Sequence, residues 1–383
     1  MRRGFSIIAL LWLCLTTSAQ SGKISMNGYV SNMHTYMIQS LDEPWITESL
    51  FHNRLNFQYY ASDNITFDLE FRNRFINSDL FSLYEAFGYE SGYYADQFEL
   101  DKGFLDLSWN WGESDPLLLN TMVDRIYLEY NKNDWNVILG RQRINWGQCF
   151  AWNPNDIFNS FTFFDFDYVE RPGSDAIRVQ YYTGMASHAE LAIKLDNDTS
   201  ITAAGLYQFN QFGYDIQLLG GLVNGDDYVG GFGFSGNIKN VSLRGELSYY
   251  IPVDVGEKTM VSALGIDYTF ENSLSIQLEG LYNQHIQADS TLNIVAYEAS
   301  SKRLGFSEYT LMANVSYPIS PLLTGTMAFM YIPDANGYYI GPSFDISLAD
   351  NINMSVVGQY FYLEAGGNET KLALAFIRFK YSF

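Results

Sequence analysis

The chain has 383 residues, with 22 lysines and arginines against 43 aspartates and glutamates, so its formal net charge at pH 7 is −21. This balance argues against nucleic acid as a partner, because binding to a phosphate backbone needs the opposite charge. Aromatic residues make up 17% of the chain and prolines number only nine, which suits a membrane β-barrel but is shared in part by large secreted β-sandwiches and β-helices.

The N-terminal residues have the pattern of a secretory signal peptide. Arg2 and Arg3 precede a short apolar run, and small residues lead to a cleavage site after Ala19. We therefore expect 1–19 to be a cleaved signal peptide and 20–383 to be a single barrel domain. No later apolar run reaches the ~18 residues that a transmembrane helix needs.

The rest of the chain repeats segments in which apolar and polar residues alternate. In the segment 51–59, Leu55, Phe57 and Tyr59 share one face, and polar residues such as Arg54 take the other. A period of two places the two sets on opposite sides of a sheet. In a soluble sandwich the apolar side would be the core, whereas in a transmembrane barrel it faces lipid.

Counting these segments predicts a transmembrane antiparallel β-barrel of about 18 strands, with 16 as the alternative. The expected strands are 24–37, 50–60, 64–75, 122–131, 134–146, 174–183, 187–196, 199–209, 212–223, 227–238, 240–251, 258–270, 273–286, 307–317, 322–332, 337–348, 351–363 and 371–383.

The connections between the expected strands alternate in length. The short ones are 61–63, 132–133, 184–186, 210–211, 239, 271–272, 318–321 and 349–350. Every long loop falls in the other set, namely 38–49, 76–121, 147–173 and 287–306. Short turns on the periplasmic rim and longer loops on the outer rim are typical of bacterial outer-membrane barrels, whereas a sandwich has no reason to sort its loops.

The C-terminal segment is the most specific local signal. Ile377, Phe379, Tyr381 and Phe383 alternate with polar residues up to the last position. This segment resembles the recognition strand of outer-membrane barrels. The resemblance implies the barrel-assembly machinery as a partner through Phe383, and the outer membrane of a Gram-negative bacterium, with its lipid, as the location.

Arginines are concentrated in the first half of the mature chain, where they are expected to line the pore. The expected pore-lining residues are Arg54, Arg72, Arg74, Arg125, Arg141, Arg143 and Arg178. Parity places most of them on the face opposite the apolar residues. A charge on the lipid-facing side would cost ~2–4 kcal/mol, so an inward position is expected. Arg141 and Arg143 share a face with Leu139 unless the register changes near Gly140, and both solutions place these arginines inside.

The loop 76–121 is long, aromatic and acidic, and we expect it to fold into the lumen opposite the arginines. The acids proposed for this constriction are Asp96, Glu99, Asp101 and Asp106. The alternative is a solvated outer loop, with the arginines paired across strands to Asp68, Glu70 and Glu129.

The loop 147–173 is the second element of the expected constriction. Its proposed residues are Trp152, Asp156, Phe158, Asp165 and Asp167. One interpretation is a slide on which sugar rings or acyl chains stack. The other, which we favour, is a packed loop that narrows the pore and holds it rigid.

Two runs around this loop also resemble a known group. Residues 140–147, GRQRINWG, and 153–159, NPNDIFN, are similar to a motif of uncharacterised porin-like barrels akin to the alginate-export group. The resemblance covers some twenty residues and the general barrel layout, and it implies a substrate-selective porin-like channel.

Enzymatic, cofactor and metal sites are not indicated by the sequence. It contains no Gly-x-Ser-x-Gly run, no His/Cys metal spacing and no phosphate-binding glycine loop, and Cys149 is the only mature cysteine. We expect a channel for small hydrophilic solutes, including saccharides. The alternatives are a non-conducting barrel with a binding or export-accessory role and, third, a lipase using His34 or His52 with Ser31 or Ser49. Assembly as a homo-oligomer stays open.

Overall fold

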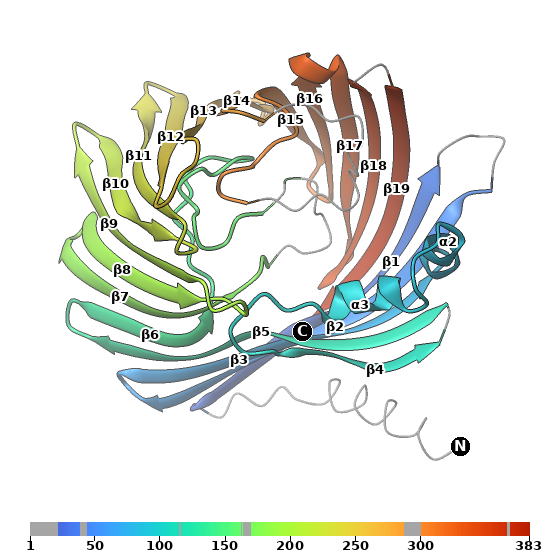
Figure 1. The fold of residues 1–383 in the computed structure, drawn as a ribbon, viewed down its shortest axis with the longest axis horizontal. Coiled ribbons are helices and arrows are strands. Elements are labelled where there is room, and N and C mark those ends of the chain that lie inside the picture. Colours follow the sequence, from blue (N-terminus) through green and yellow to red (C-terminus); the bar gives the residue numbers. More distant parts are fainter. Residues whose placement is uncertain are drawn as a thin grey trace.

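A computed structural model describes residues 22–38, 44–114, 116–161, 163, 170–286, 300–365 and 368–383. The segment predicted as a signal peptide, 1–19, lies outside these residues, as do Asp165 and Asp167. The chain forms a closed antiparallel β-barrel of 18 strands, which confirms the predicted fold class (Figure 1).

Each ring strand coincides with one of the 18 predicted segments. The ring strands are β1 (Ile24–Ile38), β2 (Ile46–Ser62), β3 (Ile65–Ser78), β5 (Leu117–Lys132), β6 (Trp135–Gln142), β7 (Ser174–Gly184), β8 (Ser187–Leu195), β9 (Ile201–Gln211), β10 (Tyr214–Val223), β11 (Asp227–Ile238), β12 (Val241–Pro252), β13 (Thr259–Thr269), β14 (Ser275–Asn283), β15 (Tyr309–Ser320), β16 (Leu323–Ile332), β17 (Gly337–Ala349), β18 (Ile352–Ala365) and β19 (Asn368–Ser382). The barrel closes where β1 pairs with β19, with Tyr29 opposite Ser382.

The two faces of the wall differ as the alternation predicts. On β3, Phe67 and Phe75 are exposed on the outer surface, whereas Asp68 and Arg72 are buried on the inner side. An apolar outer face is stable against hydrocarbon, and the charges are kept away from it. Among the described residues, no helix is long and apolar enough to cross a bilayer.

The wall departs from the predicted strands beside β5. β6 ends at Gln142 rather than at residue 146, because the chain turns into the lumen there. An unpredicted strand, β4 (Ser108–Ser114), pairs with the upper half of β5 and extends the wall above the short β6. β5 also contains a β-bulge: Glu70 lies opposite Arg125 but Phe71 lies opposite Val123, so Asp124 is an additional residue.

The loop between β3 and β5 contains two short helices, which the sequence reasoning did not predict. They are α2 (Leu80–Ala86) and α3 (Tyr93–Glu99). Phe81 and Ala95 from these helices form a buried cluster with Met33, Ile76 and Leu118 of the inner wall. This part of the loop therefore packs on the interior side of the wall. A short 3-10 helix, η1 (Pro333–Ala335), joins β16 to β17.

The segment after β6 fills much of the interior. Figure 1 shows it in green inside the ring of strands. Trp146, Trp152 and Phe158 belong to one buried cluster with small residues of the inner wall such as Ala192 and Ala204. Alanines at these positions leave room between the wall and the segment, so the wall is shaped to receive it.

Candidate functional site

The arginines on β2, β3 and β5 form an ion-pair cluster around the bulged residue Asp124. Arg54 binds the carboxylates of Asp124 and Glu70, and Arg72 lies 3.8 Å from the other oxygen of Asp124. The Asp124 side chain is completely buried and Arg54 is 2% exposed. Each buried charge here needs its partner, because an unpaired charge in this environment is strongly unfavourable.

Two further predicted arginines bind the lumenal loops. Arg74 donates to the carbonyl oxygen of Phe98 in α3 at 3.1 Å and to Asn120 Oδ1 at 2.7 Å. Arg125 donates to the carbonyl oxygens of Glu170 and Arg171 at 2.9 and 2.7 Å. Each of these arginines therefore joins one of the two loops to the wall.

Arg141, Arg143 and Arg178 lie in different surroundings. Arg141 is buried at the top of β6 and is paired with Asp101 at 2.6 Å and with Asp175 at 2.7 Å. Beside it, Gly140 has φ +122°, and a Cβ there would lie 2.3 Å from the Ile126 carbonyl oxygen, so only glycine fits this position.

Arg178 lies on the inner wall, with its Nε 3.0 Å from Glu190 Oε1. Arg143 is half-buried and exerts a positive field on the buried carboxyl of Asp156. The three arginines thus act on three separate sets of acids and do not form one stripe with Arg54 and Arg72.

The acids proposed for the first loop are not gathered around the arginines. Of these four, only Asp101 is paired with a predicted arginine, Arg141. Asp96, Glu99 and Asp106 are exposed. The cross-strand pairing of Arg54 with Glu70, the alternative considered from the sequence, is present beside this loop packing.

The second loop is held by two glutamates that the sequence reasoning did not single out. Glu246 on β12 accepts hydrogen bonds from the backbone amides of Gln148, Cys149 and Asn155. Glu279 on β14 accepts from three more, those of residues 150–152. Both glutamates are buried on the inner wall. Hydrogen bonds to an ionised carboxylate are about twice as strong as neutral ones, so the pair anchors the loop firmly.

The residues proposed for this loop are found in its buried part. Trp152 and Phe158 pack in the main buried cluster. Asp156 is also fully buried, and burial raises the pKa of its carboxyl to about 8, although the nearby Arg143 guanidinium acts in the opposite direction. These contacts dock this part of the loop on the inner wall.

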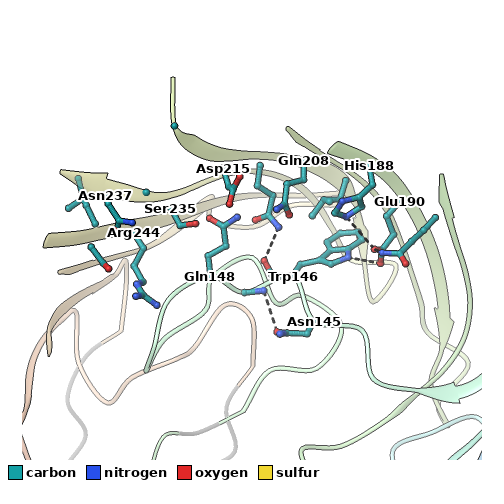
Figure 2. Close-up of a pocket in the computed structure, with 18 of the residues that line it drawn as sticks. Asn145, Trp146, Gln148, His188, Glu190, Gln208, Asp215, Ser235, Asn237 and Arg244 are labelled. Carbon is teal, nitrogen blue, oxygen red and sulfur yellow. Dashed lines mark hydrogen bonds and ion pairs between the residues drawn. The ribbon is translucent and has the colours of Figure 1, made fainter. Parts of the chain in front are cut away.

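A polar chamber remains between this loop and the strands β7 to β12. Its volume is about 570 Å³. Figure 2 shows Trp146 and Gln148 of the loop facing His188, Glu190 and Gln208 of the wall. Trp146 Nε1 donates to Glu190 Oε1 at 2.7 Å, and Gln217 Nε2 donates to the Trp146 carbonyl oxygen at 2.9 Å, so the loop forms one side of the chamber.

The serines and histidines considered for a lipase form two pairs of register partners on β1 and β2, Ser31 with His52 and His34 with Ser49. Ser31 and His52 are almost completely buried on the inner face, where a lipid ester at the outer surface cannot reach them, whereas His34 is exposed and Ser49 is half-buried. Among the described residues, no group of three or more histidines, cysteines or acids is placed to hold a metal ion.

Some of the missed residues carried a usable signal. Glu246 and Glu279 occupy inward positions of alternating strands, where an acid needs a hydrogen-bonding partner inside the barrel. Asp124 carried none, because strict alternation places it on the outer face and only the bulge turns it inward.

No protein-family model matches the sequence, and no curated protein matches it. Solved structures of outer-membrane porins do resemble the fold. OccAB4 of Acinetobacter baumannii superposes with a TM-score of 0.58 at 9% identity, covering 96% of this chain and all of that one. OccAB1 of the same organism superposes with a TM-score of 0.57 at 11% identity, covering 96% of this chain and 100% of that one. OprD of Pseudomonas aeruginosa superposes with a TM-score of 0.56 at 9% identity, covering 94% of this chain and 95% of that one.

Proposed function

We propose that this protein is a porin-like channel of a bacterial outer membrane, which passes small hydrophilic solutes through a pore narrowed by its two lumenal loops. The observation that carries the proposal is a closed 18-strand barrel with an apolar exterior, charged and amide groups inside, and two loops docked on its inner wall. A barrel of this size encloses a space wide enough for an aqueous path.

Within this proposal the arginines have two roles. Arg54 and Arg72 stabilise the wall through Asp124 and are too enclosed to meet a solute. Arg74 is half-buried beside α3, so its charge contributes to the field at the edge of the first loop. The selectivity of the pore is therefore expected to depend on Arg74 more than on the deeply buried pair.

Planar-bilayer recording of the purified protein tests the proposal. We expect stepwise conductance, and Arg74→Glu is expected to shift the reversal potential in a salt gradient toward cation selectivity. Lys132→Glu, at the exposed end of β5, is the matched control and should shift the reversal potential less. A folded protein that produces no conductance would contradict the channel.

A second candidate is a barrel that binds a partner or solute without conducting. The dense packing of Trp146, Trp152 and Phe158 against the wall favours it, because the same contacts that narrow a pore also close one. The recording separates the two functions: absence of conductance in the parent protein, with conductance gained when Glu246 and Glu279 are both replaced by glutamine, would support a plugged barrel.

A further inference from the structure

The polar chamber between the second loop and strands β7 to β12 has a distinctive balance of chemical groups. Its volume of about 570 Å³ lies within the usual range for small-molecule sites, roughly 300–1,000 Å³. The lining comes from six neighbouring strands, β7 to β12, and from the loop segment 145–148, so it is a formed concavity rather than a single loop's surface.

The arginines of the chamber are already paired with acids of the protein. Arg178 is paired with Glu190, and His188 lies 4.0 Å from the same carboxylate. Arg244 is paired with Asp267 on the neighbouring strand. Asp215 carries a negative charge and accepts a hydrogen bond from the neutral side-chain amide of Asn210, with Nδ2 2.8 Å away. An anionic solute would therefore have to break one of the arginine ion pairs to gain a direct ion pair.

Several neutral groups of the lining, in contrast, are available. Within the described part of the chain, the side chains of Gln208, Ser235, Asn237 and Ser242 make no hydrogen bond, and Oε1 of Gln148 is buried without a donor. An amide offers an acceptor oxygen and two donor hydrogens, and a hydroxyl offers both functions. This set matches a solute that both donates and accepts hydrogen bonds and carries no charge.

We propose that the chamber is a weak binding site for an uncharged polyhydroxylated solute of the sugar or polyol class. The inference deepens the proposed function and rests on it, because the site would lie on the solute's path. Affinity in the millimolar range, about 10⁻³ M, is expected, since a conducting site must also release what it binds.

The experiment compares three probes of nearly equal size that differ in charge: glucose, gluconate and glucosamine. Binding to the purified protein in detergent is measured by saturation-transfer NMR. We expect saturable binding of glucose that exceeds that of the two charged probes at least several-fold. Equal binding of all three, or no saturable binding of glucose, would overturn the proposal.

Variants locate the binding in the chamber. Gln208→Leu combined with Asn237→Leu should weaken glucose binding at least fivefold. Asn353→Leu, an exposed amide at the same rim on the opposite side of the barrel, should leave it unchanged. Gln208→Glu keeps the size of the side chain and should shift preference from glucose to glucosamine. Because Gln208→Glu is expected to gain binding of glucosamine, the proposal stays testable if the double variant misfolds. An unchanged preference of Gln208→Glu would contradict the proposal.

Liposome swelling with glucose, run in parallel, separates this inference from the channel itself. Swelling without saturable binding refutes the chamber site and leaves the channel standing. Binding without swelling supports the site and refutes the channel.

Discussion

The carboxylate of Glu279 accepts a hydrogen bond of 2.8 Å from the backbone amide of Trp152, a residue 127 positions earlier in the chain. The same carboxylate also accepts from the amides of Phe150 and Ala151. A fixed acid in the barrel wall thereby dictates the path of a loop that has no regular secondary structure. Glu246 does the same two strands away.

Glu279→Gln is expected to loosen the second loop. A neutral amide provides one acceptor oxygen in place of two charged ones, so some of the amides in 150–152 lose their partner. Hydrogen bonds to charged groups contribute roughly 1.5–3 kcal/mol each, and the loss should be of that order. Limited proteolysis of the folded barrel should then cut the loop faster, at sites identified by mass spectrometry.

Glu129→Gln is the control for this variant, because Glu129 also lies on the inner wall but hydrogen-bonds to Asn131 and Asn136 near the short-turn rim. It should leave the cleavage rate of the loop unchanged. Equal cleavage of the parent protein and Glu279→Gln would show that the carboxylate is not needed to hold the loop.

Gly233→Ala tests whether the loop needs the space that the missing side chain at Gly233 leaves on the inner wall. An added Cβ would lie 2.8 Å from Gln217 Oε1 and 3.0 Å from Asn155 Nδ2, two side chains that hydrogen-bond to each other. Overpacking of this kind costs typically 1–3 kcal/mol. We expect a lower urea midpoint for the variant. Gly230→Ala is the matched control, because a Cβ there meets nothing within 4 Å.

The strands could be predicted because each carries its own period-two pattern, and the lipid-facing side repeats from one strand to the next. Phe67 and Phe75 point outward for the same reason that Asp68 and Arg72 point inward, and both facts are readable within one segment. The loop packing was harder, because Trp152 and Phe158 look the same in sequence whether they bind a solute or pack against alanines.

The partners of the charged residues could not be predicted, because they depend on register and on one bulge. Asp124 reaches Arg54 only because an additional residue in β5 turns its side chain inward. Likewise Glu246 meets the amide of Asn155 across 91 positions of the chain. Such pairings are determined by the closed barrel as a whole and not by any local pattern.

Asp124→Asn should strongly destabilise the barrel. The substitution removes one of the two carboxylates that pair with Arg54, together with the acid that lies 3.8 Å from Arg72, so buried positive charge loses part of its compensation. Breaking a buried pair by removing one partner typically costs about 3–5 kcal/mol. Heat-dependent mobility on a gel should show unfolding at a lower temperature. Asp63→Asn, in the exposed turn between β2 and β3, provides the control and should unfold like the parent protein.

Asp156 should make the stability of the barrel depend on pH. Burial raises the pKa of its carboxyl to about 8 in the folded protein, whereas an unfolded chain has a value of about 3.9. The folded state therefore keeps the proton over a range in which the unfolded state has lost it. The resulting contribution to stability is fully present below pH ~4 and is lost as the pH rises toward 8, by at most about 1.4 kcal/mol per pH unit.

Asp156→Asn removes this titration, because asparagine stays neutral at every pH. The variant should therefore lose less stability than the parent protein between pH 5 and pH 9, and the difference should favour the variant most at pH 9. Urea midpoints at pH 5, 7 and 9 measure the effect, with Arg143 left intact in both proteins. Parallel pH profiles for the two proteins would mean that the buried carboxyl stays ionised throughout, with the Arg143 guanidinium outweighing the cost of its burial.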